Sequence, residues 1–164
     1  MPRIGKQAVP LAKRTEMLES THWAREFKRD QLDRLARHMD VYRYPTGSLL
    51  FQEGNRESSM GILVEGHISI DKNARSEGMQ VLAKLGPGKS FGEMALIDGE
   101  PRSASAHALE DVLMLVLTAD GLDSLCEDAP SLAIRLLRRI SKMMSQRLRL
   151  TSSRLADSLD TDES

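Results

Sequence analysis

Residues 91–105 combine residue types that could bind an anion together with a sugar hydroxyl. Gly92 allows a ligand to approach the backbone closely, and the short apolar run between Gly92 and Gly99 predicts one or two helical turns. The first turn of a helix carries unpaired N–H groups and a partial positive charge, which together favour a phosphate. The turn at residues 98–101 should then return Arg102 to the same place, where its guanidinium can donate two parallel bonds to a phosphodiester.

Glu93 adds a second requirement to this anion site. A carboxylate beside a phosphate repels it unless the carboxylate binds another group, and a ribose hydroxyl is a suitable donor. A nucleotide with a constrained phosphate offers both groups. The alternative interpretation is a β-hairpin with an ordinary surface Arg and Glu.

This stretch closely resembles the phosphate-binding cassette of the cyclic nucleotide-binding domain family, of the catabolite activator and protein kinase A regulatory subunit type. The matching positions are Phe91, Gly92, Glu93, Ala95, Leu96, Pro101, Arg102 and Ala104. The resemblance implies that Arg102 binds the cyclic phosphate and Glu93 the ribose 2′-hydroxyl, with backbone N–H groups completing the cradle. The ligand-binding residues predicted in the cassette are Phe91, Gly92, Glu93, Met94, Ala95, Arg102, Ser103 and Ala104.

The composition and net charge of the chain limit the classes of partner that it could bind. The 164 residues are 40% hydrophobic and 29% charged with a formal net charge of −1, which suits one soluble domain and gives no global attraction to nucleic acid or to a membrane. We therefore expect neither as a partner. No stretch approaches the roughly 18 apolar residues of a membrane span. The single Cys126, for which we expect a buried side chain, cannot form an internal disulfide, so a cytoplasmic location fits.

The spacing of glycines and apolar residues along the chain predicts an α+β fold. Short apolar runs separated by glycines between Val41 and Leu117 indicate an antiparallel β-roll, a jelly-roll-like barrel, and the family's roll has its turns at the same places. Trp23 and Phe27, then Leu32 to Met39, indicate short N-terminal helices, and a C-terminal helix pair ends in a long helix. The predicted segments are a flexible basic arm at 1–14, a domain at 15–156 with the roll at 41–117 and the C-terminal helices at 118–156, and an acidic tail at 157–164.

The spacing of potential catalytic and metal-binding residues does not indicate an enzyme or a metal site. A cupin enzyme would need clustered histidines, whereas His67 and His107 are single and have no second ligand at short spacing. No Ser-His-Asp or Cys-His order with a flanking signature occurs. We predict no metal, no cofactor and no enzymatic activity.

The last helix, predicted at residues 130–156, is apolar on two faces. Its main stripe is Ala133, Leu137, Ile140, Met144 and Leu148, widened by Leu132, Leu136, Met143 and Leu150. One face should pack on the roll and the other on a second copy of the chain, which predicts a homodimer. Thr151 and Ser152 resemble the Thr-Ser pair that meets the purine in the bacterial catabolite activator family, although about one extra helical turn precedes them. The alternative is that both hydroxyls face water.

These observations predict a regulatory or sensor module that binds a cyclic nucleotide, cyclic AMP first, with cyclic GMP left open. Family transcription factors continue into a helix-turn-helix, whereas here a short acidic segment follows the helix. We therefore expect the module to signal through an effector protein that the sequence does not identify. The alternative is the same fold binding another ligand, such as cyclic di-GMP, or acting as a non-enzymatic scaffold.

Overall fold

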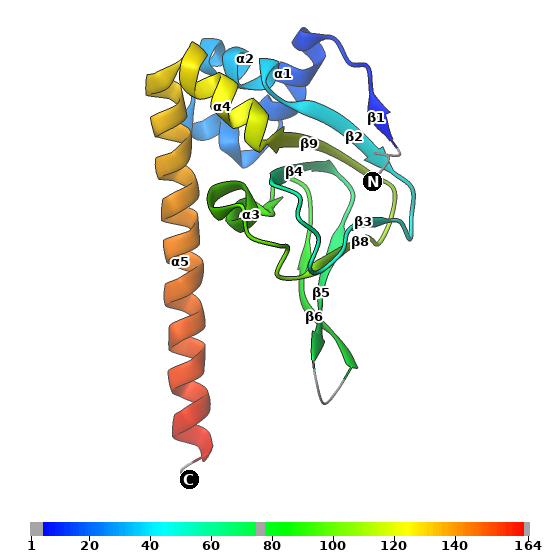
Figure 1. The fold of residues 1–164 in the computed structure, drawn as a ribbon, viewed down its shortest axis with the longest axis vertical. Coiled ribbons are helices and arrows are strands. Elements are labelled where there is room, and N and C mark those ends of the chain that lie inside the picture. Colours follow the sequence, from blue (N-terminus) through cyan, green and yellow to red (C-terminus); the bar gives the residue numbers. More distant parts are fainter. Residues whose placement is uncertain (1–4, 75–77, 163–164) are drawn as a thin grey trace.

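The structure is a computed structural model that describes residues 5–74 and 78–162. Its first elements are β1 (Lys6–Gln7), α1 (Leu11–Glu19), a 3-10 helix (His22–Glu26), α2 (Arg29–Arg37), β2 (Asp40–Tyr44), β3 (Leu49–Phe51) and β4 (Ser59–Glu65). Then follow β5 (Ile68–Ala74), β6 (Gly78–Leu85), β7 (Ser90–Phe91), α3 (Glu93–Asp98), β8 (Ser105–Ala108), β9 (Val112–Thr118), α4 (Ala119–Asp128) and α5 (Pro130–Asp162). Helices gather at one end of the β-roll, and α5 runs along its side and extends past it (Figure 1).

Two antiparallel sheets form the roll, with strand orders β1-β2-β9-β4-β7 and β3-β8-β5-β6. Strand β9 lies between two cores because its side chains alternate across the sheet. Leu113, Leu115 and Leu117 pack with the helices, whereas Val112 and Met114 pack with the second sheet between the layers. The predicted α+β fold with an antiparallel β-roll, N-terminal helices and a long last helix is confirmed.

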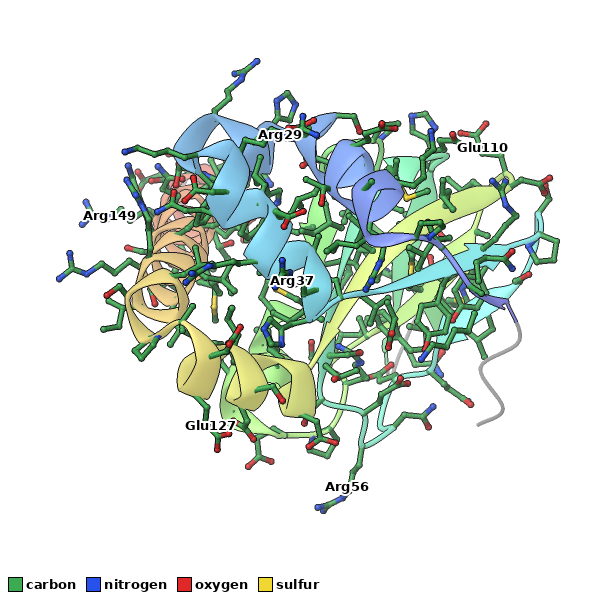
Figure 2. All side chains as sticks on the ribbon, turned by 90° about the horizontal axis from the view of Figure 1, so that it is seen from above. Arg29, Arg37, Arg56, Glu110, Glu127 and Arg149 are labelled. Carbon is green, nitrogen blue, oxygen red and sulfur yellow. The ribbon has the colours of Figure 1, made fainter. Side chains whose placement is uncertain are left out.

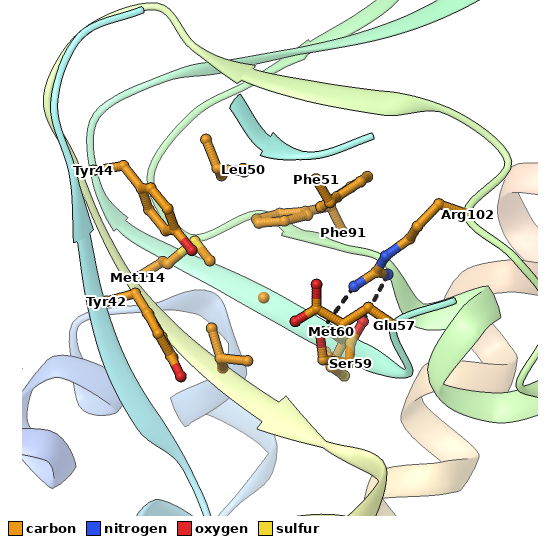
Figure 3. Close-up of a pocket in the computed structure, with 12 residues that line it drawn as sticks. Tyr42, Tyr44, Leu50, Phe51, Glu57, Ser59, Met60, Phe91, Arg102 and Met114 are labelled. Carbon is orange, nitrogen blue, oxygen red and sulfur yellow. Dashed lines mark hydrogen bonds between the residues drawn. The ribbon is translucent and has the colours of Figure 1, made fainter. Parts of the chain in front are cut away.

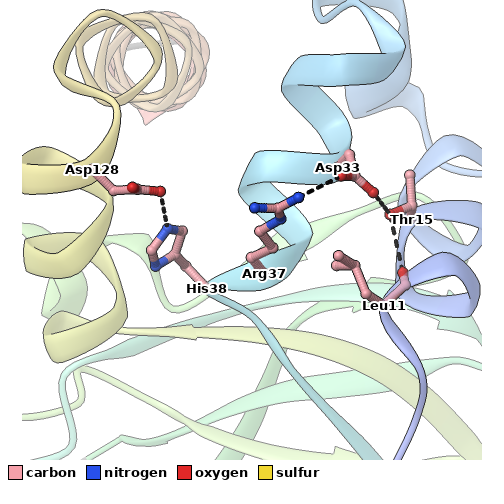
Figure 4. A network of polar contacts seen from close by, with 6 residues as sticks. All are labelled: Leu11, Thr15, Asp33, Arg37, His38 and Asp128. Carbon is pink, nitrogen blue, oxygen red and sulfur yellow. Dashed lines mark hydrogen bonds and ion pairs between the residues drawn. The ribbon is translucent and has the colours of Figure 1, made fainter.

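Polar contacts tie the helices to one another at the end of the roll (Figure 4). The hydroxyl of Thr15 donates to Asp33 Oδ1 at 3.0 Å, which joins α1 to α2, and Arg37 pairs with the same carboxylate at 3.3 Å. His38 Nε2 lies 3.2 Å from Asp128 Oδ2, which joins the end of α2 to the end of α4. These contacts hold α4, and therefore the start of α5, against α2.

Helix α5 has a packed first half and an exposed second half. Leu132, Ala133, Leu136 and Ile140 are buried in the helical core. Arg139 lies over the ring of Trp23 at 4.5 Å and pairs with Glu26, which fixes the same half. Beyond Arg147 every described residue of α5 is exposed, so the second half projects from the body of the molecule (Figure 1).

Several boundary expectations were wrong. Part of the expected flexible arm is ordered: β1 pairs with β2, α1 begins at Leu11, and Arg14 donates to the carbonyls of Ala36 and Met39 at the end of α2. Arg14 thereby satisfies carbonyls at a helix end, which a charge count does not reveal. The last helix continues through the expected acidic tail to Asp162. Residues 1–4 and 163–164 lie outside the described residues. Cys126 is exposed, not buried, because it lies on the outer face of α4.

Candidate ligand-binding site

The cassette 91–105 is shaped by two glycines in the left-handed backbone region. Gly92 precedes α3 at φ +80° and Gly99 ends it at φ +68°. A Cβ at Gly92 would lie 2.5 Å from Arg102 Nη1 and 2.8 Å from the carbonyl oxygen of Ser59, so no other residue fits there without displacing one of them. The turn after α3 brings Arg102 beneath the first turn of the helix, as the sequence predicts.

The guanidinium of Arg102 points into the roll and is 5% exposed (Figure 3). Its Nη1 donates to the carbonyl oxygens of Ser59 at 2.8 Å and Gly92 at 3.2 Å, and its Nη2 donates to the Ser59 hydroxyl at 2.8 Å. The group also lies 4.3 Å above the ring of Phe51. Burial lowers the pKa of Arg102 from its ordinary value, although the carboxylates of Glu57 and Glu93 act in the opposite direction. An arginine remains charged at neutral pH under such a shift.

A small cavity lies between the sheets beside Arg102 (Figure 3). Its volume is about 20 Å³, which is room for roughly one water molecule. The lining includes Tyr42, Phe51, Phe91 and Met114. This space, as the structure has it, is smaller than a nucleotide.

Glu93, at the start of α3, is 2% exposed and is joined to α5. Its Oε2 accepts a bond from Arg147 Nη1 at 3.1 Å, and Arg147 Nη2 donates to the carbonyl oxygen of Ser90 at 3.1 Å. Close by, the hydroxyl of Ser90 contacts the sulfur of Met143 at 3.4 Å. The long helix therefore contacts Glu93 of the cassette through one ion pair, and Ser90, just before the cassette, through one backbone hydrogen bond and one sulfur contact.

Two buried polar atoms of the cassette have no hydrogen-bond partner within the described residues. One is the acceptor Oε1 of Glu93, and the other is the donor Nε of Arg102. Leaving such a group unpaired costs about 1 to 3 kcal/mol, and more when the group is charged. Unpaired buried groups are uncommon in native proteins and call for an explanation.

The other predicted cassette residues play different parts. Phe91, Ala95 and Ala104 are buried, and Phe91 stacks on Phe51 with ring centroids 5.8 Å apart. Met94 is 54% exposed. Ser103 is exposed, and its carbonyl accepts a bond from Lys72 Nζ at 2.9 Å.

Thr151 and Ser152 are both exposed on the free half of α5. The hydroxyl of Thr151 donates to the carbonyl of Arg147 at 2.9 Å, one turn earlier in the same helix. The structure does not bring either hydroxyl into contact with the cassette. Their proposed contact with a base therefore requires the ligand itself to bridge the gap.

Sequence reasoning missed two residues that define this site. Ser59 holds Arg102 and Arg147 holds Glu93, across 43 and 54 residues of chain respectively. Arg147 carried a weak signal, since it lies one helical turn before Thr151 on the same side of α5. Ser59 carried none. The two strand histidines each contact one carboxylate: His67 pairs with Glu110, and His107 Nδ1 lies 2.6 Å from Asp71.

Comparison with known proteins shows which family the chain belongs to. The sequence profile described as "Cyclic nucleotide-binding domain" matches residues 41–129. The chain belongs to the cyclic nucleotide-binding domain family. A crystal structure of a cyclic nucleotide-binding domain from Methylobacillus flagellatus covers 92% of this chain and 85% of that one, at 28% identity and a TM-score of 0.77.

Two relatives illustrate the settings of such domains. The CRP-like cAMP-activated global transcriptional regulator of Mycobacterium tuberculosis is 30% identical over 128 residues, which cover 78% of this chain and 55% of that protein. A cyclic nucleotide-gated potassium channel of Mesorhizobium japonicum is 38% identical over 89 residues, or 54% of this chain and 23% of the channel. The chain therefore spans about half the length of the first relative and less of the second. In the described residues, no helix has the length and apolar character to cross a membrane.

Proposed function

We propose that this domain is a regulatory sensor for a cyclic mononucleotide, with cyclic AMP as its main ligand. One observation carries the proposal: the cassette holds a buried acceptor on Glu93 and a buried donor on Arg102, both without partners in the described residues. A cyclic nucleotide supplies the complementary pair, because its ribose 2′-hydroxyl can donate and its phosphate oxygens can accept. A regulator that is cAMP-activated is among the relatives, which supports adenine over guanine.

Arg102 is held so that a phosphate would reach its remaining edge. The Ser59 and Gly92 contacts occupy Nη1 and Nη2, and they leave Nε without a partner. Because Nε is covered in the structure, the atoms around it must move when a phosphate binds. Backbone N–H groups of residues 92–95 and 103–104 would complete the cradle.

Helix α5 is the proposed output of the domain. Arg147 binds the same carboxylate that would accept the ribose hydroxyl, so ligand binding and the position of α5 are linked through Glu93. Thr151 or Ser152 would then meet the base, and the shift of α5 would be read by an effector protein in the cytoplasm. A homodimer through α5 fits the exposed apolar residues of its second half. The proposed domain limits are residues 15–156, with α5 extending beyond them.

Calorimetric titration of matched variants tests the site assignment. A charge-assisted hydrogen bond contributes about 1.5 to 3 kcal/mol, so Arg102→Gln should weaken cyclic AMP binding by tens to hundreds of times. Glu93→Gln should weaken it by about tenfold. The controls are Arg56→Gln and Glu100→Gln, two exposed residues near the same loops. Thermal unfolding of each variant confirms that it is folded.

Two results would overturn the assignment. If folded Arg102→Gln binds cyclic AMP as tightly as the parent, Arg102 does not bind the phosphate. If the parent binds cyclic di-GMP and no mononucleotide, the second candidate ligand is correct. The buried, internally bonded state of Arg102 favours a scaffold if neither ligand binds.

A further inference from the structure

A row of basic residues follows the side of α5 that faces away from the β-roll. Residues three, four or seven apart lie on one side of a helix, and this basic row comprises Arg135, Arg138, Lys142 and Arg149. All four are exposed, and none is paired with an acidic residue within the described part of the chain. Figure 2 shows Arg149 projecting outward from α5. At about 1.5 Å per residue, the basic row is about 21 Å long.

The net charge of the chain conceals this row. The whole chain has 23 basic and 24 acidic residues, whereas residues 130–156 contain seven basic residues and no acidic one. Arg139 and Arg147 are paired with acidic residues of other elements, so they do not add to the row. On the neighbouring helix α4, Glu127 points to a different side of the molecule from Arg149 (Figure 2). A positive surface therefore persists along one side of a chain whose formal net charge is −1.

Exposed apolar side chains border the basic row. Ile134 is 56% exposed and Leu148 is 68% exposed. Leu148 is also available to the proposed dimer contact, whereas Ile134 belongs to the first half of α5 and is left for another partner. A helix with basic and apolar residues side by side on its exposed surface is typical of a helix that lies on an anionic membrane surface.

The shape of this surface favours a bilayer over a nucleic acid. Helix α5 forms one side of the molecule (Figure 1), so a flat surface can meet the basic row along its whole length. The phosphates of a nucleic acid would bind the basic residues but would leave Ile134 in water. Asp160 lies on the same side of α5, about 16 Å beyond Arg149. This separation exceeds the Debye length of about 8 Å at physiological salt, so Asp160 does not cancel the row.

We infer that the first half of α5 binds the surface of a bilayer rich in anionic phospholipid. The basic row meets the headgroup phosphates, and Ile134 lies at their boundary with the acyl chains. Each basic residue near such a surface strengthens binding about fivefold, and salt screens the attraction. The contact is peripheral and reversible, which is compatible with the proposed cytoplasmic location. It does not depend on the proposed ligand site, because no residue of the cassette belongs to the basic row.

Co-sedimentation with lipid vesicles tests the charge argument. At low salt the parent should sediment with vesicles of equal parts phosphatidylglycerol and phosphatidylcholine, and not with phosphatidylcholine alone. Arg138→Gln with Lys142→Gln should lower the partition coefficient by about 25-fold. The control, Arg56→Gln with Lys84→Gln, removes the same charge from exposed positions outside α5 and should leave partitioning nearly unchanged. Equal loss in the two double variants would show that net charge, and not the basic row, causes binding, which would overturn the inference.

A tryptophan at position 134 tests which surface meets the bilayer. The native Trp23 is 1% exposed, so its emission should not respond to vesicles. Emission of Ile134→Trp should shift to shorter wavelength with the anionic vesicles. Emission of Met79→Trp, which replaces a side chain 62% exposed on β6, should not shift.

Three results would contradict the membrane contact. They are a shift for Met79→Trp alone, no binding of the folded parent to anionic vesicles, and binding to duplex DNA of arbitrary sequence without binding to vesicles. The last result would identify nucleic acid as the partner of the basic row. All three leave the calorimetric test of the ligand site unaffected.

Discussion

Replacing Gly92 with alanine is the sharpest structural test of how Arg102 is held. A non-glycine residue in the left-handed region costs roughly 1 to 2 kcal/mol. The new Cβ would also lie 2.5 Å from Arg102 Nη1 and 2.8 Å from the Ser59 carbonyl, so Arg102 must move. Losing one of its charge-assisted bonds adds about 1.5 to 3 kcal/mol. We therefore expect Gly92→Ala to lower the free energy of unfolding by about 2.5 to 5 kcal/mol.

Gly47 supplies a matched control. Its φ of +82° nearly equals that of Gly92, and a Cβ there would meet nothing within 4 Å. Gly47→Ala should therefore lose only the backbone contribution of about 1 to 2 kcal/mol. Urea unfolding of both variants and the parent gives the two free energies, and calorimetry should show cyclic AMP binding weakened for Gly92→Ala alone. Equal destabilisation of the two variants would refute the proposed packing of Arg102 beneath the cassette.

Three further outcomes follow from the same contacts. Arg147→Met should separate α5 from Glu93, so amide hydrogen exchange at residues 143–155 should become faster. The control is Arg149→Met, an exposed residue two positions further along α5, which should leave the exchange unchanged. With nucleotide bound to the parent, exchange should slow at residues 92–105 and at 147–155; slowing at the first segment alone would mean that no signal reaches α5. The Thr46 N–H and hydroxyl lower the pKa of Asp111 below its unfolded value of about 3.9. Ionised Asp111 therefore stabilises the folded state above about pH 4, and this contribution is lost as the pH falls through the folded pKa. The free energy of unfolding of Asp111→Asn should be lower than that of the parent near neutral pH and equal to it in strong acid.

The cassette could be predicted because its information is local. Gly92 and Gly99 mark both ends of α3, and the proline before Arg102 fixes the return of the chain. Turn glycines similarly divide the roll into strands. These positions need backbone conformations that few residue types adopt, so they can be recognised in the sequence without the tertiary structure.

The contacts that complete the site could not be predicted, because they join distant segments. Ser59 belongs to β4, and nothing in its neighbourhood of sequence distinguishes it from other strand serines. Arg147 has the same residue type as several neighbours on α5, and only packing of the helix selects it to meet Glu93. The prediction of a separate acidic tail was wrong for a related reason. A charged segment is typical of a mobile chain end, yet here α5, which begins at Pro130, continues through it to Asp162.

Titration of the parent chain with cyclic AMP, cyclic GMP and cyclic di-GMP tests the central claim most directly. We predict saturable binding of one cyclic AMP per chain, weaker binding of cyclic GMP, and no binding of the dinucleotide, with thermal unfolding shifted upward in the same order. Absence of both heat and thermal shift with cyclic AMP, in a folded sample, would contradict the account.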